Sequence, residues 1–287
     1  MKKELLLLTG QGFLGLNLIK NFKKKFQITI VGTNSNKSIK YKIPKEIKVL
    51  NINLFKLKNF NLNKPYIIIT TLNNLEKNFY NKFKKLVDNI KKTDPQKVIF
   101  ISTAAIKNKS EVNSNSNLYQ YIKNAELAEK ICLQNFTNLT ILRVANIFGP
   151  FKSKPSFIEK IIISSLHNLN FFHYKSNLVR SYIHVDEFCK IIKTIFFLKK
   201  MKKILYYISN KNFILSSNQI IKIFLKMNFK LKIYYHDQKY EILKSIIKNS
   251  YFEKETNFKF EKNFIKKINS TTNFYKNYYL TKKTFFL

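Results

Sequence analysis

The sequence predicts an α/β protein in which a doubly wound parallel sheet is joined to a smaller, mainly helical C-terminal lobe. Three observations lead to this fold class. Short apolar runs alternate with amphipathic stretches in the first half, a glycine-rich turn follows the first run, and the alternation weakens after Pro150. A length of 287 residues suits one large domain with an added lobe.

The strands of the first half are expected where apolar residues run continuously, because parallel strands are buried on both faces. Six such segments are residues 4–9, 27–33, 47–52, 66–71, 97–103 and 139–147. Apolar residues at helical spacing indicate intervening helices at 13–24, 78–94 and 126–136.

The second half is less regular. We expect a helix over 183–200, a strand over 204–209 and a helical lobe over 213–287. The predicted domains are therefore a sheet domain and a substrate-binding lobe, formed by 1–149 with 181–209 and by 150–180 with 210–287 respectively.

The charge is strongly positive, with 53 Lys and Arg against 16 Asp and Glu. Such a balance can indicate nucleic-acid binding. However, residues with A/T-rich codons dominate the whole chain, the lysines are spread along it, and Arg143 and Arg180 are its only arginines. Nucleic-acid surfaces use arginine for bidentate contacts. We therefore attribute the charge to codon bias and expect no specific nucleic-acid partner.

Cysteine content and hydropathy bear on the location of the protein. The two cysteines, Cys132 and Cys189, have no metal-binding or disulfide-framework spacing, which fits a reducing cytoplasm. No apolar run approaches the length of a membrane span, and the run after Met1 ends too early for a signal peptide. We expect a cytoplasmic protein with no metal site, and leave open a homodimer.

A glycine-rich turn joins the first strand to the first helix. Its residues are Gly10, Gln11, Gly12, Phe13, Leu14 and Gly15, which read G-x-G-x-x-G. This pattern permits a tight turn, close approach to a pyrophosphate and close packing of helix on strand, and the helix N-terminus offers free N–H groups. The turn therefore predicts a Rossmann-like dinucleotide-binding site.

The end of the second strand bears on the choice between NAD and NADP. An acidic residue there would bind the ribose 2′-hydroxyl of NAD, but this chain has Thr33 and Asn34, with Lys37 nearby. Asn34 is assigned to the cofactor site. The sequence leaves both cofactors open and leans slightly toward NADP.

Candidate catalytic residues follow the fifth strand. Ser102 and Thr103 close that strand, and Tyr119 and Lys123 further on have Tyr-x-x-x-Lys spacing. On a helix, residues four positions apart lie on one face. We therefore expect Tyr119 and Lys123 to act as a pair.

Taken together, the ordered motifs resemble the extended short-chain dehydrogenase/reductase family, the NAD-dependent epimerases and dehydratases of nucleotide sugars. The motifs are "LLTGQGFLG", "VIFISTAAI", "YQYIKNAELAEK", "LTILRVANIFGP" and "RSYIHVDEF". The resemblance covers nearly the whole chain. Both arginines fall inside these motifs although the chain is poor in arginine, which strengthens the resemblance.

The resemblance implies roles for these residues. Tyr119 would be the general acid/base at a sugar hydroxyl or ketone, and Lys123 would stabilise its phenolate and hold the nicotinamide ribose. Thr103 would hydrogen-bond the reacting oxygen, with Ser102 beside it in the cofactor site. Arg180 and Asn146 would bind the substrate, a nucleotide-diphosphate sugar.

The chain also departs from the family pattern. Ala104 and Ala105 replace the Asp-Glu pair that dehydratases carry after the threonine, so the sequence favours an epimerase or a 4-ketoreductase over a dehydratase. We expect a role in surface polysaccharide synthesis. Two alternatives stay open: a non-catalytic dinucleotide-binding scaffold or sensor of the same fold, and a nucleic-acid binder driven by charge.

Overall fold

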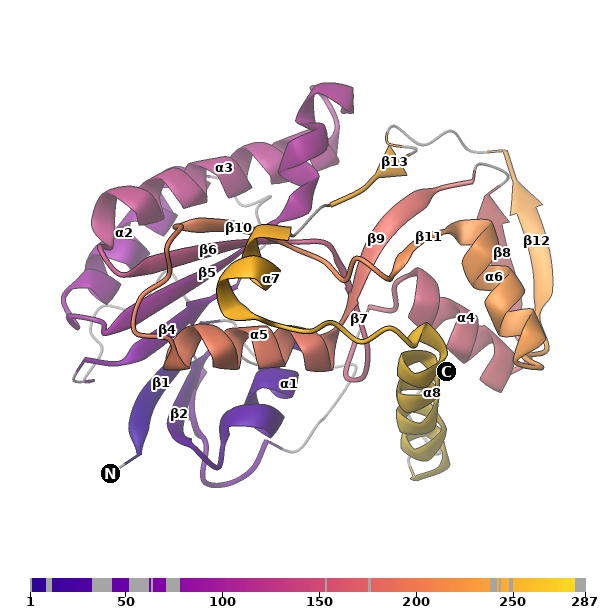
Figure 1. Ribbon diagram of the computed structural model, residues 1–287, viewed down its shortest axis with the longest axis horizontal. Coiled ribbons are helices and arrows are strands. Elements are labelled where there is room, and N and C mark those ends of the chain that lie inside the picture. The colour runs from indigo at the N-terminus through magenta and orange to yellow at the C-terminus, as the bar shows by residue number, and fades with distance from the viewer. Residues whose placement is uncertain are drawn as a thin grey trace.

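The computed structural model shows a layered α/β body joined to a second body built around a small sheet (Figure 1). The residues that it describes are 2–8, 12–32, 43–51, 62, 64–70, 78–152, 154–174, 177–237, 242, 244–247 and 250–281. Within these ranges, no helix has both the length and the apolar character needed to cross a bilayer.

The first body is centred on a seven-stranded parallel sheet with the order β10-β6-β5-β4-β1-β2-β3. Its strands are β1 (Lys3–Leu8), β2 (Phe26–Val31), β3 (Lys48–Leu50), β4 (Tyr66–Ile69), β5 (Lys97–Thr103), β6 (Leu139–Val144) and β10 (Leu205–Ile208). The strand order reverses between β1 and β4, as in doubly wound folds. This arrangement confirms the predicted fold class.

Helices cover both faces of this sheet, which explains why its strands are apolar without alternation. In β1, Leu5 and Leu7 pack in a core with the helices of one face, whereas Leu6 and Leu8 pack in the core of the other. The helices of the first face are α1 (Phe13–Phe22) and α5 (Val185–Phe197), and those of the second are α2 (Phe79–Lys91) and α3 (Asn117–Asn135). A 3₁₀ segment, Ala104–Glu111, links β5 to α3.

The second body has its own apolar core. Its helices are α4 (Phe157–Leu166), α6 (Ser217–Lys226) and α8 (Phe264–Thr281). Its strands are β7 (Asn146–Phe148), β8 (Asn170–Tyr174), β9 (Val179–His184), β11 (Ile214–Ser216), β12 (Lys232–His236) and β13 (Lys244–Ser245). The short helix α7 (Ser250–Thr256) belongs to the predicted lobe, but its Phe252 packs in the core of the first body.

Candidate active site

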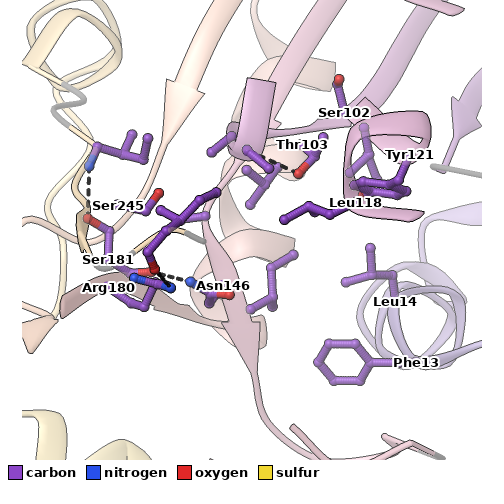
Figure 2. A pocket seen from close by; sticks show the side chains of 18 of the residues that line it. Phe13, Leu14, Ser102, Thr103, Leu118, Tyr121, Asn146, Arg180, Ser181 and Ser245 are labelled. Atoms are coloured by element: carbon purple, nitrogen blue, oxygen red, sulfur yellow. Dashed lines mark hydrogen bonds between the residues drawn. The ribbon is translucent and has the colours of Figure 1, made fainter. Parts of the chain in front are cut away.

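A cavity of about 830 Å³ opens at the carboxyl ends of β5 and β6, between the two bodies (Figure 2). Ligands of doubly wound folds bind at this edge of the sheet. Residues from α1, β5 and α3 line one side, and residues from β9 and β13 line the other. Each body therefore contributes one wall of the cavity.

The N-terminus of α1 faces this cavity. Gly12 precedes the helix, Phe13 and Leu14 line the cavity, and Gly15 is buried. The first turn of α1 carries no acidic residue, and no described side chain hydrogen-bonds the cap. The first N–H groups of a helix have no intrahelical partner and attract anions, so this end fits the pyrophosphate of a dinucleotide.

Three residues assigned to the cofactor site, Gly10, Gln11 and Asn34, lie outside the described residues. Their assignment therefore rests on the sequence alone. The described half of the turn, from Gly12 to Gly15, lies where the motif requires it, between the carboxyl end of β1 and the cavity.

The carboxyl end of β5 brings Ser102 and Thr103 to the cavity wall. The Thr103 hydroxyl accepts a hydrogen bond from the backbone N–H of Ala105 at 3.2 Å and caps the 3₁₀ segment. Because a hydroxyl is both donor and acceptor, Thr103 keeps a donor that can serve a ligand. Ser102 is buried, and its hydroxyl donates to the Glu129 carboxylate on α3 at 2.5 Å.

Helix α3 presents Leu118 and Tyr121 to the cavity, as Figure 2 shows. The predicted pair, Tyr119 and Lys123, is not among the lining residues. Tyr119 is partly buried with the Lys109 ammonium 5.6 Å from its ring centre, and Lys123 is exposed. Each residue turns the helix by about 100°, so Tyr119 and Tyr121 point to nearly opposite sides.

The reason for this difference is that the spacing of Tyr119 and Lys123 establishes only a shared helix face. It does not show which face lies against the sheet. The buried residues of α3 do show it, and they include Ile122, Ala125 and Ala128, next to the Tyr121 side. That apolar stripe is the sequence signal that could have identified Tyr121.

Two predicted substrate residues line the opposite part of the cavity. Asn146 is exposed and donates through its side-chain amide to the Ser181 carbonyl at 3.3 Å. The Arg180 guanidinium donates to the backbone carbonyls of Val179 and Ile242. These contacts hold the guanidinium across the cavity from Thr103 (Figure 2).

Lys152 is a second cation of the cavity wall. The sequence does not single it out, because lysines are common throughout the chain. Its ammonium donates to the Ile147 carbonyl at 2.6 Å and the Ser156 hydroxyl at 2.9 Å, and lies 5.0 Å from the centre of the Phe13 ring. Burial lowers the pKa of Lys152, and nearby Glu159 opposes that shift.

The described lining of the cavity contains Lys152 and Arg180 but no Asp or Glu. Outside the lining, the buried Glu159 forms an ion pair with Lys152 at 3.7 Å. In the described part of the chain, no cluster of three or more His, Cys, Asp or Glu side chains is arranged to hold a metal ion. The electrostatics of the wall therefore suit an anionic ligand.

The sequence of the chain matches one known protein family. The model of the NAD dependent epimerase/dehydratase family matches residues 6–204. Among curated proteins, no sequence matches the chain.

Solved structures share the fold at low identity. UDP-N-acetylglucosamine 4-epimerase from Methanobrevibacter ruminantium M1, in complex with UDP-N-acetylmuramic acid, has 18% identity and a TM-score of 0.77 over 97% of this chain and 100% of its own. UDP-glucose 4-epimerase from Thermotoga maritima, with UDP-glucose, has 14% identity and a TM-score of 0.78 over 96% and 99%. UDP-glucuronic acid 4-epimerase from Bacillus cereus, with UDP-glucuronic acid and NAD, has 14% identity and a TM-score of 0.77 over 96% and 100%.

Proposed function

Since the chain belongs to the NAD dependent epimerase/dehydratase family, we propose that it transfers a hydride at a hydroxyl or ketone of a nucleotide-diphosphate sugar, as an epimerase or a 4-ketoreductase. One observation carries this proposal. A single cavity, with Lys152 and Arg180 in its lining, brings together the N-terminus of α1, Thr103, Tyr121 and the guanidinium of Arg180. The helix N-terminus would bind a dinucleotide and the guanidinium a sugar nucleotide; Figure 2 shows Tyr121 on the side of α1 and Arg180 across the cavity.

The proposed cofactor is NAD. The family description and the Bacillus cereus relative both name NAD, and neither supports the slight lean toward NADP. Gly12, Phe13 and Leu14 would hold the pyrophosphate, with Gly10 and Gln11 completing the turn by motif and Asn34 near the adenosine ribose. When bound, NAD supplies the acceptor and donor of the hydride.

We assign proton transfer to Tyr121 in place of Tyr119, because Tyr121 lines the cavity. Tyr121 would take the proton of the sugar hydroxyl as the hydride leaves the same carbon, and would return it in the reverse direction. The Thr103 hydroxyl would donate a hydrogen bond to that oxygen and fix its position. Arg180 would bind the diphosphate, since a guanidinium matches phosphate bidentately, and Asn146 would contact the sugar.

The wall beside Thr103 argues against elimination of water. Ala104 is buried and Ala105 lines the cavity, so neither position supplies an acid or base. Epimerisation or ketone reduction needs only the proton transfer assigned to Tyr121. A cytoplasmic location in a polysaccharide pathway is consistent with two buried, unpaired cysteines.

A second candidate, a non-catalytic dinucleotide-binding protein, is favoured by one specific feature of α3. Four residues after Tyr121 stands Ala125, which is fully buried, so the helix brings no lysine to Tyr121 at the spacing of the family's Tyr-x-x-x-Lys pair. Such a protein would bind NAD and a sugar nucleotide in the same cavity without converting them.

The test compares Tyr121→Phe with Tyr119→Phe as the matched control. Purified protein is incubated with NAD and UDP-glucose, UDP-N-acetylglucosamine or UDP-glucuronic acid, and products are separated by chromatography. Loss of a general acid/base lowers kcat by about 10²- to 10⁴-fold, so we expect this loss in Tyr121→Phe, with NAD affinity retained, and a change below about twofold in Tyr119→Phe.

Other results would redirect or refine the proposal. Loss of turnover in Tyr119→Phe alone would support the pair expected from spacing. Binding of NAD and UDP-sugars without conversion by the wild type would support the non-catalytic candidate. NAD retained after purification, read by mass spectrometry, would indicate an epimerase, which recycles its cofactor, whereas consumption of added dinucleotide would indicate a reductase.

A further inference from the structure

A buried carboxylate on α3, outside the cavity, connects the helix to the sheet. Glu129 is 4% exposed, and its carboxylate accepts hydrogen bonds from residues of two neighbouring strands. From β5, the Ser102 hydroxyl donates at 2.5 Å, and from β6, Arg143 donates through Nε at 2.9 Å and through Nη2 at 2.6 Å. Arg143 also donates through Nη1 to the Tyr207 hydroxyl of β10 at 2.7 Å.

This network is charged and directional. Burial opposes the positive charge of Arg143, but the hydrogen bonds and charge of Glu129 prevail and raise the pKa of the guanidinium above its usual range. A planar guanidinium and a planar carboxylate that share two parallel bonds leave little freedom of rotation. Glu129 is therefore held in one orientation relative to β5 and β6.

Apolar side chains form another part of the contact between α3 and the sheet. Ala125, Ala128 and Cys132 lie buried on the same side of the helix. Apolar packing of small side chains is not directional, so it sets the distance between helix and sheet more strongly than the rotation of the helix. The Glu129 bonds, in contrast, are directional.

The rotation of α3 determines which tyrosine faces the cavity. Glu129 follows Tyr121 by eight residues, which corresponds to about 12 Å along the axis and a net turn of about 80°. Glu129 lies about 80° from Tyr121 in one direction and about 80° from Tyr119 in the other, so its bonds hold the helix at the boundary between the two tyrosines. Of the two, Tyr121 is the one on the buried side with Ala125. The Ser102 hydroxyl bound to the same carboxylate belongs to the residue next to Thr103.

We propose that Glu129 is a positioning residue: it fixes the rotation of α3 on β5 and β6 so that the Tyr121 hydroxyl and the Thr103 hydroxyl face the same point of the cavity. The catalytic part of this inference rests on the proposed function, but the orientation of Tyr121 does not. Ser102 then serves as a link in this network, and its proximity to the cofactor site is a consequence of its place at the end of β5.

The test compares Glu129→Gln with Glu126→Gln on the same helix. Glutamine keeps the shape of Glu129 but removes the charge and one acceptor of the Arg143 fork. Glu126 pairs with Lys109 at a half-exposed position away from the cavity, so its variant controls for loss of a carboxylate from α3. Displacing a reacting group by about 1 Å can lower turnover 10²-fold. We expect kcat to fall about 10- to 100-fold in Glu129→Gln, with KM for UDP-glucose within threefold, and no change in Glu126→Gln.

A second readout is independent of turnover. The protein is labelled with 3-fluorotyrosine, and the ¹⁹F signal of Tyr121 is identified by its loss in Tyr121→Phe. In wild type and Glu126→Gln this signal should shift when UDP-glucose and NAD are added, and in Glu129→Gln the shift should shrink by more than half. If no sugar is converted by the wild type but the ¹⁹F result holds, the proposed function fails and the positioning role stands.

Two results would overturn the positioning role. One is an unchanged ¹⁹F response and unchanged kcat in folded Glu129→Gln. The other is a lowered thermal midpoint in Glu129→Gln with kcat unchanged per folded molecule, which would make the network structural only. Should Glu129→Gln fail to fold, Ser102→Ala decides, because it removes one bond and keeps the ion pair. The proposal then requires at least a threefold decrease in kcat and a reduced ¹⁹F response.

Discussion

Helix α3 carries two carboxylates one turn apart, Glu129 at the edge of its buried face and Glu126 on its half-exposed face. On one face, Glu129 pairs with Arg143 at side-chain exposures of 5% and 18%. On the other, Glu126 pairs with Lys109, both side chains being 34% exposed. One tyrosine accompanies each pair, Tyr121 in the cavity wall and Tyr119 near Lys109.

This difference shows that the surroundings of an ion pair, more than the residue types in it, decide how much the pair contributes to the free energy of unfolding. Water and salt screen the half-exposed pair, and such pairs contribute little to stability. The pair at Glu129 is shielded from water, and removing one partner leaves the other charge without compensation. We therefore expect the two faces of α3 to respond very differently to equivalent substitutions.

The largest effect is expected for Glu129→Ala. This substitution leaves Arg143 partly buried without its carboxylate and Ser102 without its acceptor, and breaking such a pair lowers the free energy of unfolding by about 3–5 kcal/mol. The matched change, Glu126→Ala, should lower it by less than about 1 kcal/mol. Urea denaturation followed by circular dichroism measures both.

Equal values for the two variants would contradict this prediction. They would show that solvent reaches the Glu129 pair and that the two faces do not differ energetically. A change in the dependence of the free energy on urea concentration would indicate an altered unfolded or native state, so the slopes are compared as well.

The fold illustrates what local sequence can predict. The run "KVIFIST" was expected as a strand over 97–103, and β5 has these bounds, because a strand buried on both faces must be apolar throughout. The strands of the second body were not predicted. Segments such as β12 (Lys232–His236) are short and largely exposed, so they carry no continuous apolar run.

The candidate site likewise contains residues that the sequence predicted and a residue that it did not. Thr103 at the end of β5 and Phe13 after β1 line the cavity because the carboxyl ends of parallel strands meet at one edge, and Arg180, near the start of β9, lines the opposite wall. Their roles in binding and catalysis stay predictions. The position of Tyr121 in the cavity wall was not predicted, because the assignment used the spacing of a pair rather than the burial of the helix face. Asn34 lies outside the described residues, and its role stays a prediction.

A smaller effect is expected for Arg143→Lys, which preserves the charge but removes the fork. A lysine ammonium cannot make the two parallel bonds to Glu129 and also reach the Tyr207 hydroxyl. We expect the free energy of unfolding to fall by about 1–3 kcal/mol, as for loss of hydrogen bonds to charged groups. The reverse change on the other face, Lys109→Arg, should stay within about 0.5 kcal/mol of wild type.

A decrease in Lys109→Arg as large as that in Arg143→Lys would show that both faces require a specific cation. The planar geometry of the guanidinium would then not be the property that distinguishes the Glu129 network. Thermal unfolding at low and high salt adds a check: both substitutions keep the positive charge, so neither variant should change its difference from wild type with salt.

The smallest effect is expected for Lys123→Ala, and this variant separates the two interpretations of α3 most directly. Lys123 is exposed, so its loss should change the free energy of unfolding by no more than about 0.5 kcal/mol. If Tyr121 transfers the proton, kcat should also stay within about twofold of wild type, because loss of a true catalytic partner lowers rates by about 10²-fold or more. A large loss of turnover with unchanged stability would require Lys123 to reach the cavity when ligands bind. It would return the catalytic role to the face that carries Tyr119.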